Sequence, residues 1–206
     1  MSYSDFKTID DILAKFDVTI SSGDSLFADV PDIPASPELA KMLDTTVPLA
    51  LNINTEKARS ELIIAPLLVE VRNLLERKIS LFSGIDFSVD VSRNLNGFCD
   101  FILSYSRDQA FLQTPVICIV EAKNENLKSG YAQCMAEMLA AQMYNEQKAH
   151  PVSWILGVVT TGSNWKFLTL EGAKFSIDFD EYMIMQVAKI LGIFVEGVHH
   201  IVRAGA

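Results

Sequence analysis

The sequence predicts an α/β fold, because helical and strand-like patterns alternate along most of the chain. Residues 97–103 and 115–121 are hydrophobic runs with the length and composition of buried strands. Residues 131–147 form a helical pattern that is apolar on most sides, which implies that this helix is buried against a sheet. The chain has 206 residues, 50% of them hydrophobic, so it is long enough for one domain with a full core.

The first 50 residues are expected to form an N-terminal extension packed on the core. Residues 5–16 have helical periodicity, and residues 17–27 can supply a short strand and a turn. Three prolines follow between residues 31 and 37, so this stretch is expected to cross the surface. Ser36 followed by Pro37 then indicates the start of a helix.

The longest helical pattern covers residues 54–82. Thr55 is placed to cap this helix, whereas Pro66 lies inside it and predicts a kink or a break. Hydrophobic alternation over residues 85–91 predicts a strand, and the turn at residues 94–97 lets the following strand pair back as a hairpin.

The second half of the chain repeats this alternation of strands and helices. A polar loop over residues 104–114 precedes the strand that starts at Pro115. After the buried helix, residues 154–161 and 165–170 predict a second hairpin. Residues 179–202 are expected to close the chain as one or two helices.

Two of the predicted strands carry carboxylates where a buried strand should not tolerate them. Asp100 lies in the first strand, and Glu121 ends the second, two residues before Lys123. Side chains two positions apart on a strand share a face, so Glu121 and Lys123 project together. Two carboxylates on neighbouring strands suit Mg²⁺, and a lysine beside them can orient water and offset phosphate charge; the alternative is a structural salt bridge.

The composition limits the location and partners of this protein. Seventeen basic against 26 acidic residues give a net charge of −9, which argues against easy nucleic-acid binding, since nucleic-acid-binding proteins usually present a basic surface. The three cysteines lie in apolar segments without metal-ligand spacing, as expected for free thiols in a reducing compartment. The C-terminal apolar segment contains too many polar residues for a membrane span. A cytoplasmic protein with no membrane association is therefore expected.

The order of these features resembles the PD-(D/E)XK nuclease superfamily, which includes restriction endonucleases and Holliday junction resolvases, and within it an uncharacterised bacterial branch. The likeness covers residues 54–175 and rests on a helix with a glutamate, a strand with Asp100, the Glu121-Ala122-Lys123 segment and a helix with Gln133. It implies a restriction endonuclease-like three-layer domain over residues 51–206, in which a mixed sheet in αβββαββ order is flanked by helices.

The resemblance also implies roles for individual residues. Asp100 and Glu121 would bind Mg²⁺ or Mn²⁺, Lys123 would position water, and Gln133 would steady the site. The first-helix glutamate would add a metal ligand, directly or through water. Glu56 and Glu61 are both candidates, with Glu61 preferred because it lies deeper in the apolar pattern; five residues apart, they do not share a helix face.

One departure from the motif is Cys99, which stands where the name of the motif has proline. The acidity of the chain is the other departure, and it bears on the substrate more than on the site.

Three functions follow from this reading. The first is an Mg²⁺-dependent DNA endonuclease, with a protein partner supplying recognition and a homodimer, joined through the C-terminal helix, making double-strand cuts. The second is a catalytically silent relative that serves protein–protein interaction, which the acidic surface favours. The third is a hydrolase that acts on RNA with the same site.

Overall fold

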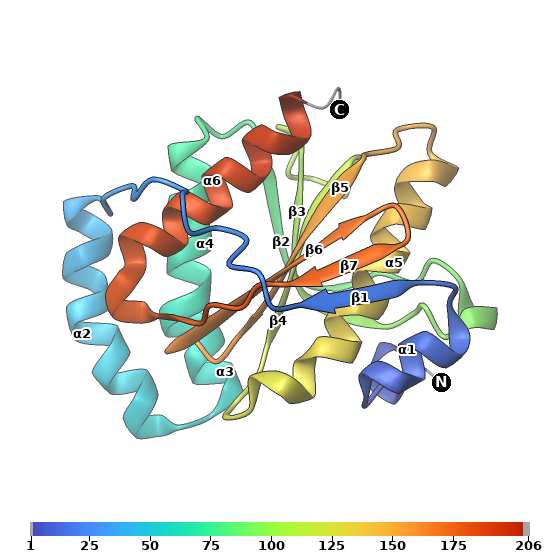
Figure 1. Ribbon diagram of the computed structural model, residues 1–206. Coiled ribbons are helices and arrows are strands. Elements are labelled where there is room, and N and C mark those ends of the chain that lie inside the picture. The colour runs from blue at the N-terminus through green and yellow to red at the C-terminus, as the bar shows by residue number, and fades with distance from the viewer. Residues whose placement is uncertain (1, 204–206) are drawn as a thin grey trace.

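The computed structural model describes residues 2–203, which form one mixed sheet with helices on both faces (Figure 1). The sheet order is β1-β7-β6-β5-β4-β3-β2, and β8 pairs with β6. Neighbouring strands are antiparallel except for the pairs β4–β5 and β1–β7, which are parallel. The strands are β1 Thr19–Ser22, β2 Ser80–Asp86, β3 Phe98–Ser104, β4 Val116–Ala122, β5 Trp154–Thr160, β6 Asn164–Glu171, β7 Lys174–Ile177 and β8 Tyr182–Met183.

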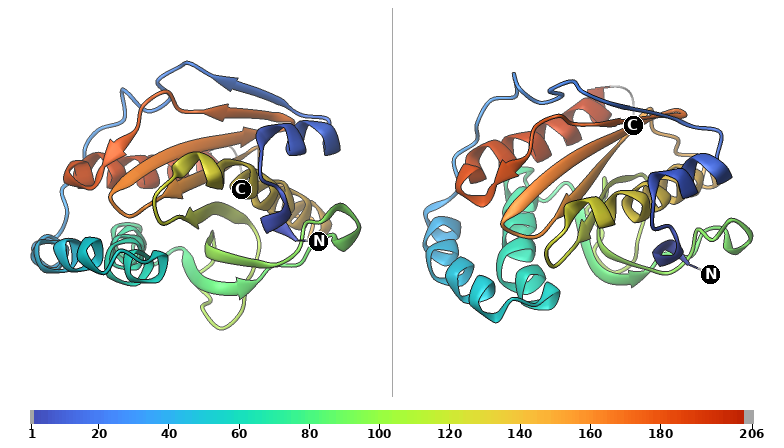
Figure 2. Two further views of the ribbon diagram at one scale, coloured as in Figure 1. Left: turned by 90° about the horizontal axis from the view of Figure 1, so that it is seen from below. Right: turned by 60° about the horizontal axis from the view of Figure 1, so that its bottom comes forward.

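The helices form two layers that bury separate apolar clusters on the two faces of the sheet. Helices α2, α4 and α6 cover one face, and α5 with α1 covers the other (Figures 1 and 2). The helices are α1 Ile9–Lys15, α2 Pro37–Ile53, α3 Glu56–Arg59, α4 Ala65–Leu74, α5 Tyr131–Gln147 and α6 Val187–Arg203. Shorter turns are η1 Tyr3–Asp5, η2 Ser60–Ile64, η3 Val91–Arg93, η4 Leu127–Gly130 and η5 Ile184–Gln186. The predicted α/β class with a mixed, helix-flanked sheet is confirmed.

Helix α5 lies in close contact with the sheet, as its apolar composition predicted. Its bounds match the predicted helix. All its residues from Ala132 to Ala141 are buried except Gln133. Helix α5 approaches the sheet closely near Gly157 of β5, where an added Cβ atom would overlap the sulfur of Met138. A larger residue at this point of β5 would therefore force the Met138 side chain to move.

The predicted helix over residues 54–82 is interrupted and ends early, so that expectation was wrong in part. Thr55 does cap α3 by accepting a hydrogen bond from the Ala58 amide at 3.1 Å. The chain then makes the π-helical turn η2 immediately before Pro66, whose missing N–H group cannot continue the α-helical hydrogen bonds. The break that Pro66 predicted is confirmed.

The strand expected over residues 85–91 was placed too late in the sequence, because the preceding helix was predicted to be too long. Helix α4 ends at Leu74, and Glu76 and Arg77 then adopt left-handed backbone conformations that turn the chain. Strand β2 consequently starts at Ser80, five residues earlier than expected, and residues 91–93 form the turn η3. The predicted antiparallel pairing with the Asp100 strand is confirmed.

The ends of the chain take part in both layers and in the sheet. Strand β1 extends the edge of the sheet, α1 packs against α5, and α2 packs near η2 and α4. The expected boundary between the N-terminal extension and the core domain, at residues 50 and 51, lies within α2. The short strands β7 and β8 were not predicted, and the terminal helical region therefore starts at residue 184 and not at 179.

The C-terminal segment is long and apolar enough to cross a membrane, so the expectation that it is too polar was wrong, but α6 forms part of the core. Residues Ile184–Ile201 reach a mean hydropathy of 1.3, and half of that window is buried within the protein. Ile190, Phe194 and Val198 belong to the cluster between α6 and the sheet. This placement is typical of the core helix of a soluble protein, and it leaves those side chains unavailable for the dimer interface that the sequence had suggested.

Candidate functional site

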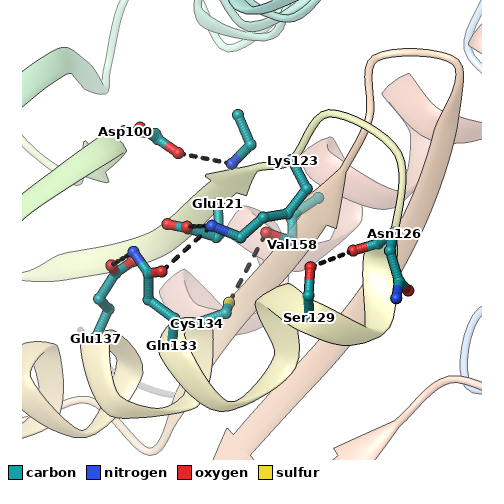
Figure 3. Close-up of polar contacts among 10 residues, drawn as sticks. Asp100, Glu121, Lys123, Asn126, Ser129, Gln133, Cys134, Glu137 and Val158 are labelled. Atoms are coloured by element: carbon teal, nitrogen blue, oxygen red, sulfur yellow. Dashed lines mark hydrogen bonds and ion pairs between the residues drawn. The ribbon is translucent and has the colours of Figure 1, made fainter. Parts of the chain in front are cut away.

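The structure brings Asp100 and Glu121 together on the face of the sheet that α5 covers. Phe101 pairs with Val120 across β3 and β4, and continuing this register places Asp100 opposite Glu121. Directly opposite side chains on antiparallel strands lie within about 5.5 Å of one another at Cβ. The two carboxylates that the sequence singled out are therefore cross-strand neighbours at the end of β4 (Figure 3).

Hydrogen bonds hold both carboxylates in place. The Asp100 Oδ2 atom accepts a hydrogen bond from the Ala122 amide at 2.8 Å. Glu121 is 1% exposed, and its Oε1 atom accepts from the Lys123 ammonium group. The predicted contact between Glu121 and Lys123 is thus confirmed, and it is made by residues on one side of the strand end.

The hydrogen-bonded chain continues from Lys123 into α5. The Lys123 Nζ atom donates to Gln133 Oε1 at 3.2 Å, and Gln133 Nε2 donates to Glu137 Oε1 at 3.1 Å (Figure 3). These bonds orient the Gln133 amide with its oxygen towards Lys123. Gln133, which was expected to steady the site, therefore lies in contact with it.

Burial shifts the pKa values of the acidic groups upward. Desolvation, with added repulsion from Asp100, raises the pKa of Glu121 to about 8. Desolvation also raises the pKa of Asp100 and holds that of Glu137 well above its usual value, where the charge of Glu121 adds to the effect. Burial lowers the pKa of Lys123, but the attraction of the nearby carboxylates, above all Glu121, has the larger combined effect in the opposite direction. The pKa of Lys123 is therefore raised. Glu121 and Glu137 thus hold a proton more readily in the folded protein than they do in water.

Two buried oxygen atoms in this cluster have no hydrogen-bond partner. They are Glu121 Oε2 and Glu137 Oε2. A buried carboxylate oxygen without a partner is costly, and a cation that coordinates it removes the cost. No group of three or more His, Cys, Asp or Glu side chains among residues 2–203 is arranged to hold a metal ion. Mg²⁺ needs only one or two carboxylates because it retains several waters, so Asp100 and Glu121 fit such an ion.

The structure separates the two first-helix glutamates. Glu56 lies at the start of α3, and desolvation raises the pKa of its carboxyl group. The charge of Lys123 lowers this pKa and that of Asp100 raises it, so Glu56 is close enough to interact with both residues. Helix α3 is anchored there by Arg59, whose guanidinium donates to the Thr161 carbonyl at 2.8 Å.

Glu61 lies elsewhere, so the preference for it over Glu56 is not supported by the geometry. Its side chain is 63% exposed and lies 3.8 Å from the Lys57 ammonium group. It lines a surface groove between α2 and α4 together with Met42 and Val69. Five residues apart, Glu56 and Glu61 point about 140° apart on a helix, and only the packing of this segment shows that Glu56 is the one near the cluster.

Glu137 is the residue of the cluster that sequence reasoning missed. It is fully buried among the apolar residues of α5, where an unpaired carboxylate is unfavourable. Its spacing of four from Gln133 places both on one helix face, and this spacing was the available signal. Cys99, at the position of the motif proline, is also buried beside the cluster, and repulsion from Glu137 adds to the desolvation that raises its thiol pKa.

Comparisons with known proteins do not identify this chain. No family model matches it, and no curated protein sequence is significantly similar to it.

Proposed function

We propose that this protein is an Mg²⁺-dependent endonuclease that hydrolyses the phosphodiester bonds of DNA, with Mn²⁺ as an alternative metal. One observation carries the proposal: Asp100 and Glu121 lie side by side on neighbouring strands, and the Lys123 ammonium group is bonded to Glu121. Two oxygen ligands next to one cation suit a site that binds a metal and a phosphate together.

We further propose that the chain belongs to the PD-(D/E)XK superfamily. The elements from α3 to β6 run as a helical segment, three strands, a helix and two strands, which is the αβββαββ order that the resemblance implies. Asp100 lies in β3, Glu121 and Ala122 end β4 with Lys123 directly after it, and Gln133 lies in α5.

In this proposal each residue has a distinct task. Asp100 and Glu121 would hold the metal, which supplies an activated water and offsets charge on the phosphate. Glu56 lies at the rim of the site, where it can bind through water. Lys123 orients the attacking water and stabilises negative charge on the phosphate. Gln133 keeps the Lys123 ammonium group directed at Glu121 by accepting its second hydrogen bond.

The net charge of −9 supports weak intrinsic affinity for DNA, with a partner protein supplying recognition. RNA is the alternative substrate at the same site. We place the protein in the cytoplasm, where its three buried cysteines stay reduced.

A second candidate function is protein–protein interaction by a catalytically silent protein. Its support is a set of large apolar side chains exposed on α2 and α4, which a partner or a second copy of the chain could cover. These residues are Met42, Leu49, Leu51, Ile53, Val69 and Leu74.

Calorimetry with Mg²⁺ and Mn²⁺, followed by cleavage assays on DNA and RNA, tests the proposed endonuclease. We expect Asp100→Asn and Glu121→Gln to abolish metal binding and to reduce cleavage at least about 100-fold, because each removes a charged ligand. Asp44→Asn, an exposed change on α2, is the matched control. A wild-type protein that neither binds metal in the presence of nucleic acid nor cleaves it would overturn the proposal in favour of the interaction protein.

The two first-helix glutamates give a second prediction. Glu56→Gln is expected to slow cleavage about 10-fold, the usual effect of losing an outer group of a metal site. Glu61→Gln should leave the rate within about twofold, since such exposed residues outside a site contribute little. Single-turnover rates measure both changes, and equal effects of the two variants would contradict the assignment of Glu56.

A further inference from the structure

A second groove lies beside the candidate site and contains three lysines. It has a volume of about 690 Å³ and is lined by Lys7, Lys128 and Lys166, together with Tyr131 and Phe179. These residues come from the segment before α1, from η4 and the start of α5, and from β6 and the loop after β7. Figure 2 shows α1 and the start of α5 next to the β6–β7 part of the sheet.

The lysines in this groove are free to bind an anion. None of the three has an acidic side chain within ion-pair distance among the described residues, and Lys166 Nζ donates to the Phe179 carbonyl at 2.8 Å. The carboxylate that lines the groove, Asp178, is buried and accepts from the Leu26 amide and the Tyr182 hydroxyl. The hollow thus holds three lysines without an ion-pair partner within residues 2–203 beside one buried carboxylate, an excess of positive charge on a chain with a net charge of −9.

The sheet register places this groove next to the carboxylates. Glu121 pairs with Val159, and Val159 pairs with Lys166, so all three side chains lie in one row on one face. Strands are about 4.8 Å apart, so Lys166 lies about 10 Å from Glu121 across the sheet.

The wall between the two sites is thin. A Cβ atom at Gly130 would lie 2.6 Å from Val159 and 3.1 Å from Lys123. Gly130 immediately precedes Tyr131, which lines the groove, so the junction of η4 and α5 lies between the groove and Lys123.

The aromatic side chains favour a single strand over a duplex. Phe179 is 67% exposed although its ring is large and apolar, and Tyr131 is half-buried at the other side of the hollow. Such rings stack on unpaired bases, while neighbouring lysines neutralise the phosphates. A duplex would require a broader positive surface than three lysines provide.

We propose that this groove binds the single-stranded segment of nucleic acid that flanks the bond to be cut, an inference that rests on the proposed endonuclease. The phosphates lie on Lys7, Lys128 and Lys166, and a base stacks on Phe179. Lys7 and Phe179 lie outside residues 54–175, where the family resemblance was recognised. The N-terminal segment thus supplies part of the substrate site.

Fluorescence anisotropy with a labelled dT oligonucleotide in EDTA tests the groove without any cleavage. Combining Lys7→Gln, Lys128→Gln and Lys166→Gln is expected to weaken binding at least about 10-fold and to remove a salt-dependence slope of about −2, the value for three phosphate contacts. Phe179→Ala should weaken binding about fivefold or more through lost stacking. Circular dichroism and thermal melting check that each variant is folded.

The matched control removes three other lysines that do not line the groove: Lys41→Gln, Lys148→Gln and Lys174→Gln. This control changes the net charge by the same amount. If both triple variants weakened oligonucleotide binding equally, the effect would come from overall charge, and the proposed binding site in the groove would be overturned. Failure of the wild-type protein to bind the oligonucleotide, or preference for a duplex of equal length, would also overturn it. Groove-dependent binding without cleavage on adding Mg²⁺ would instead refute the proposed endonuclease alone.

Discussion

Replacing Lys123 by Met is expected to slow cleavage about 100- to 1,000-fold while metal binding persists or becomes tighter. The Lys123 ammonium group occupies Glu121 Oε1, so a metal and the lysine compete for the same carboxylate. Without the lysine, Glu121 is left to the metal, but the cation that orients water and neutralises the phosphate is lost. The cleavage rate should therefore fall, whereas the affinity for the metal should stay the same or rise.

Single-turnover cleavage and calorimetry on the same preparations measure these two effects. Lys57→Met is the matched control, because Lys57 is exposed and faces only Glu61 in the described structure. If Lys123→Met abolished metal binding as thoroughly as Glu121→Gln does, Lys123 would serve to build the site and not to act on the phosphate.

The buried carboxylates should make the protein less stable as pH rises. Glu121 has a usual pKa of 4.5 when unfolded and about 8 when folded, so between these values the folded state binds more protons than the unfolded state. Its contribution to stability is therefore fully present below pH 4.5 and is lost as pH rises through 8. Across pH 6 to 8 we expect the free energy of unfolding to fall by about 2 kcal/mol from this group.

Glu137→Gln should make the free energy of unfolding depend less on pH, because desolvation raises the pKa of Glu137 as it does that of Glu121. The substitution keeps an oxygen that can accept from Gln133 and removes a buried charge, so we expect a gain of about 1 to 3 kcal/mol at pH 8.5.

Urea unfolding at pH 5.5 and 8.5, in EDTA, measures both effects. Glu146→Gln, an exposed change on the same helix, is the control. An equal loss of stability with pH in wild type and Glu137→Gln would show that Glu137 has no part in it.

The candidate site was predictable where chemistry and strand periodicity decided it. Asp100 and Glu121 were recognisable because carboxylates interrupt apolar runs, and the Glu121–Lys123 contact follows from the period of two along a strand. The Thr55 cap, the break at Pro66 and the bounds of α5 were also predictable, because each depends on a few neighbouring residues. The short strands β7 and β8 were not, since a few residues carry too little periodicity.

By itself, the sequence determined the α/β class, the order of elements around Asp100 and Lys123, and the chemical types available to the site. Only the tertiary structure decided that Glu56 approaches the cluster while Glu61 lines the groove between α2 and α4, because this depends on which side of the helical segment packs towards the sheet. Sheet order likewise brings Lys166 into the row of Glu121, and the fold of the N-terminal segment adds Lys7 to the same groove. Such proximities depend on which strands become neighbours, and local patterns do not encode that choice.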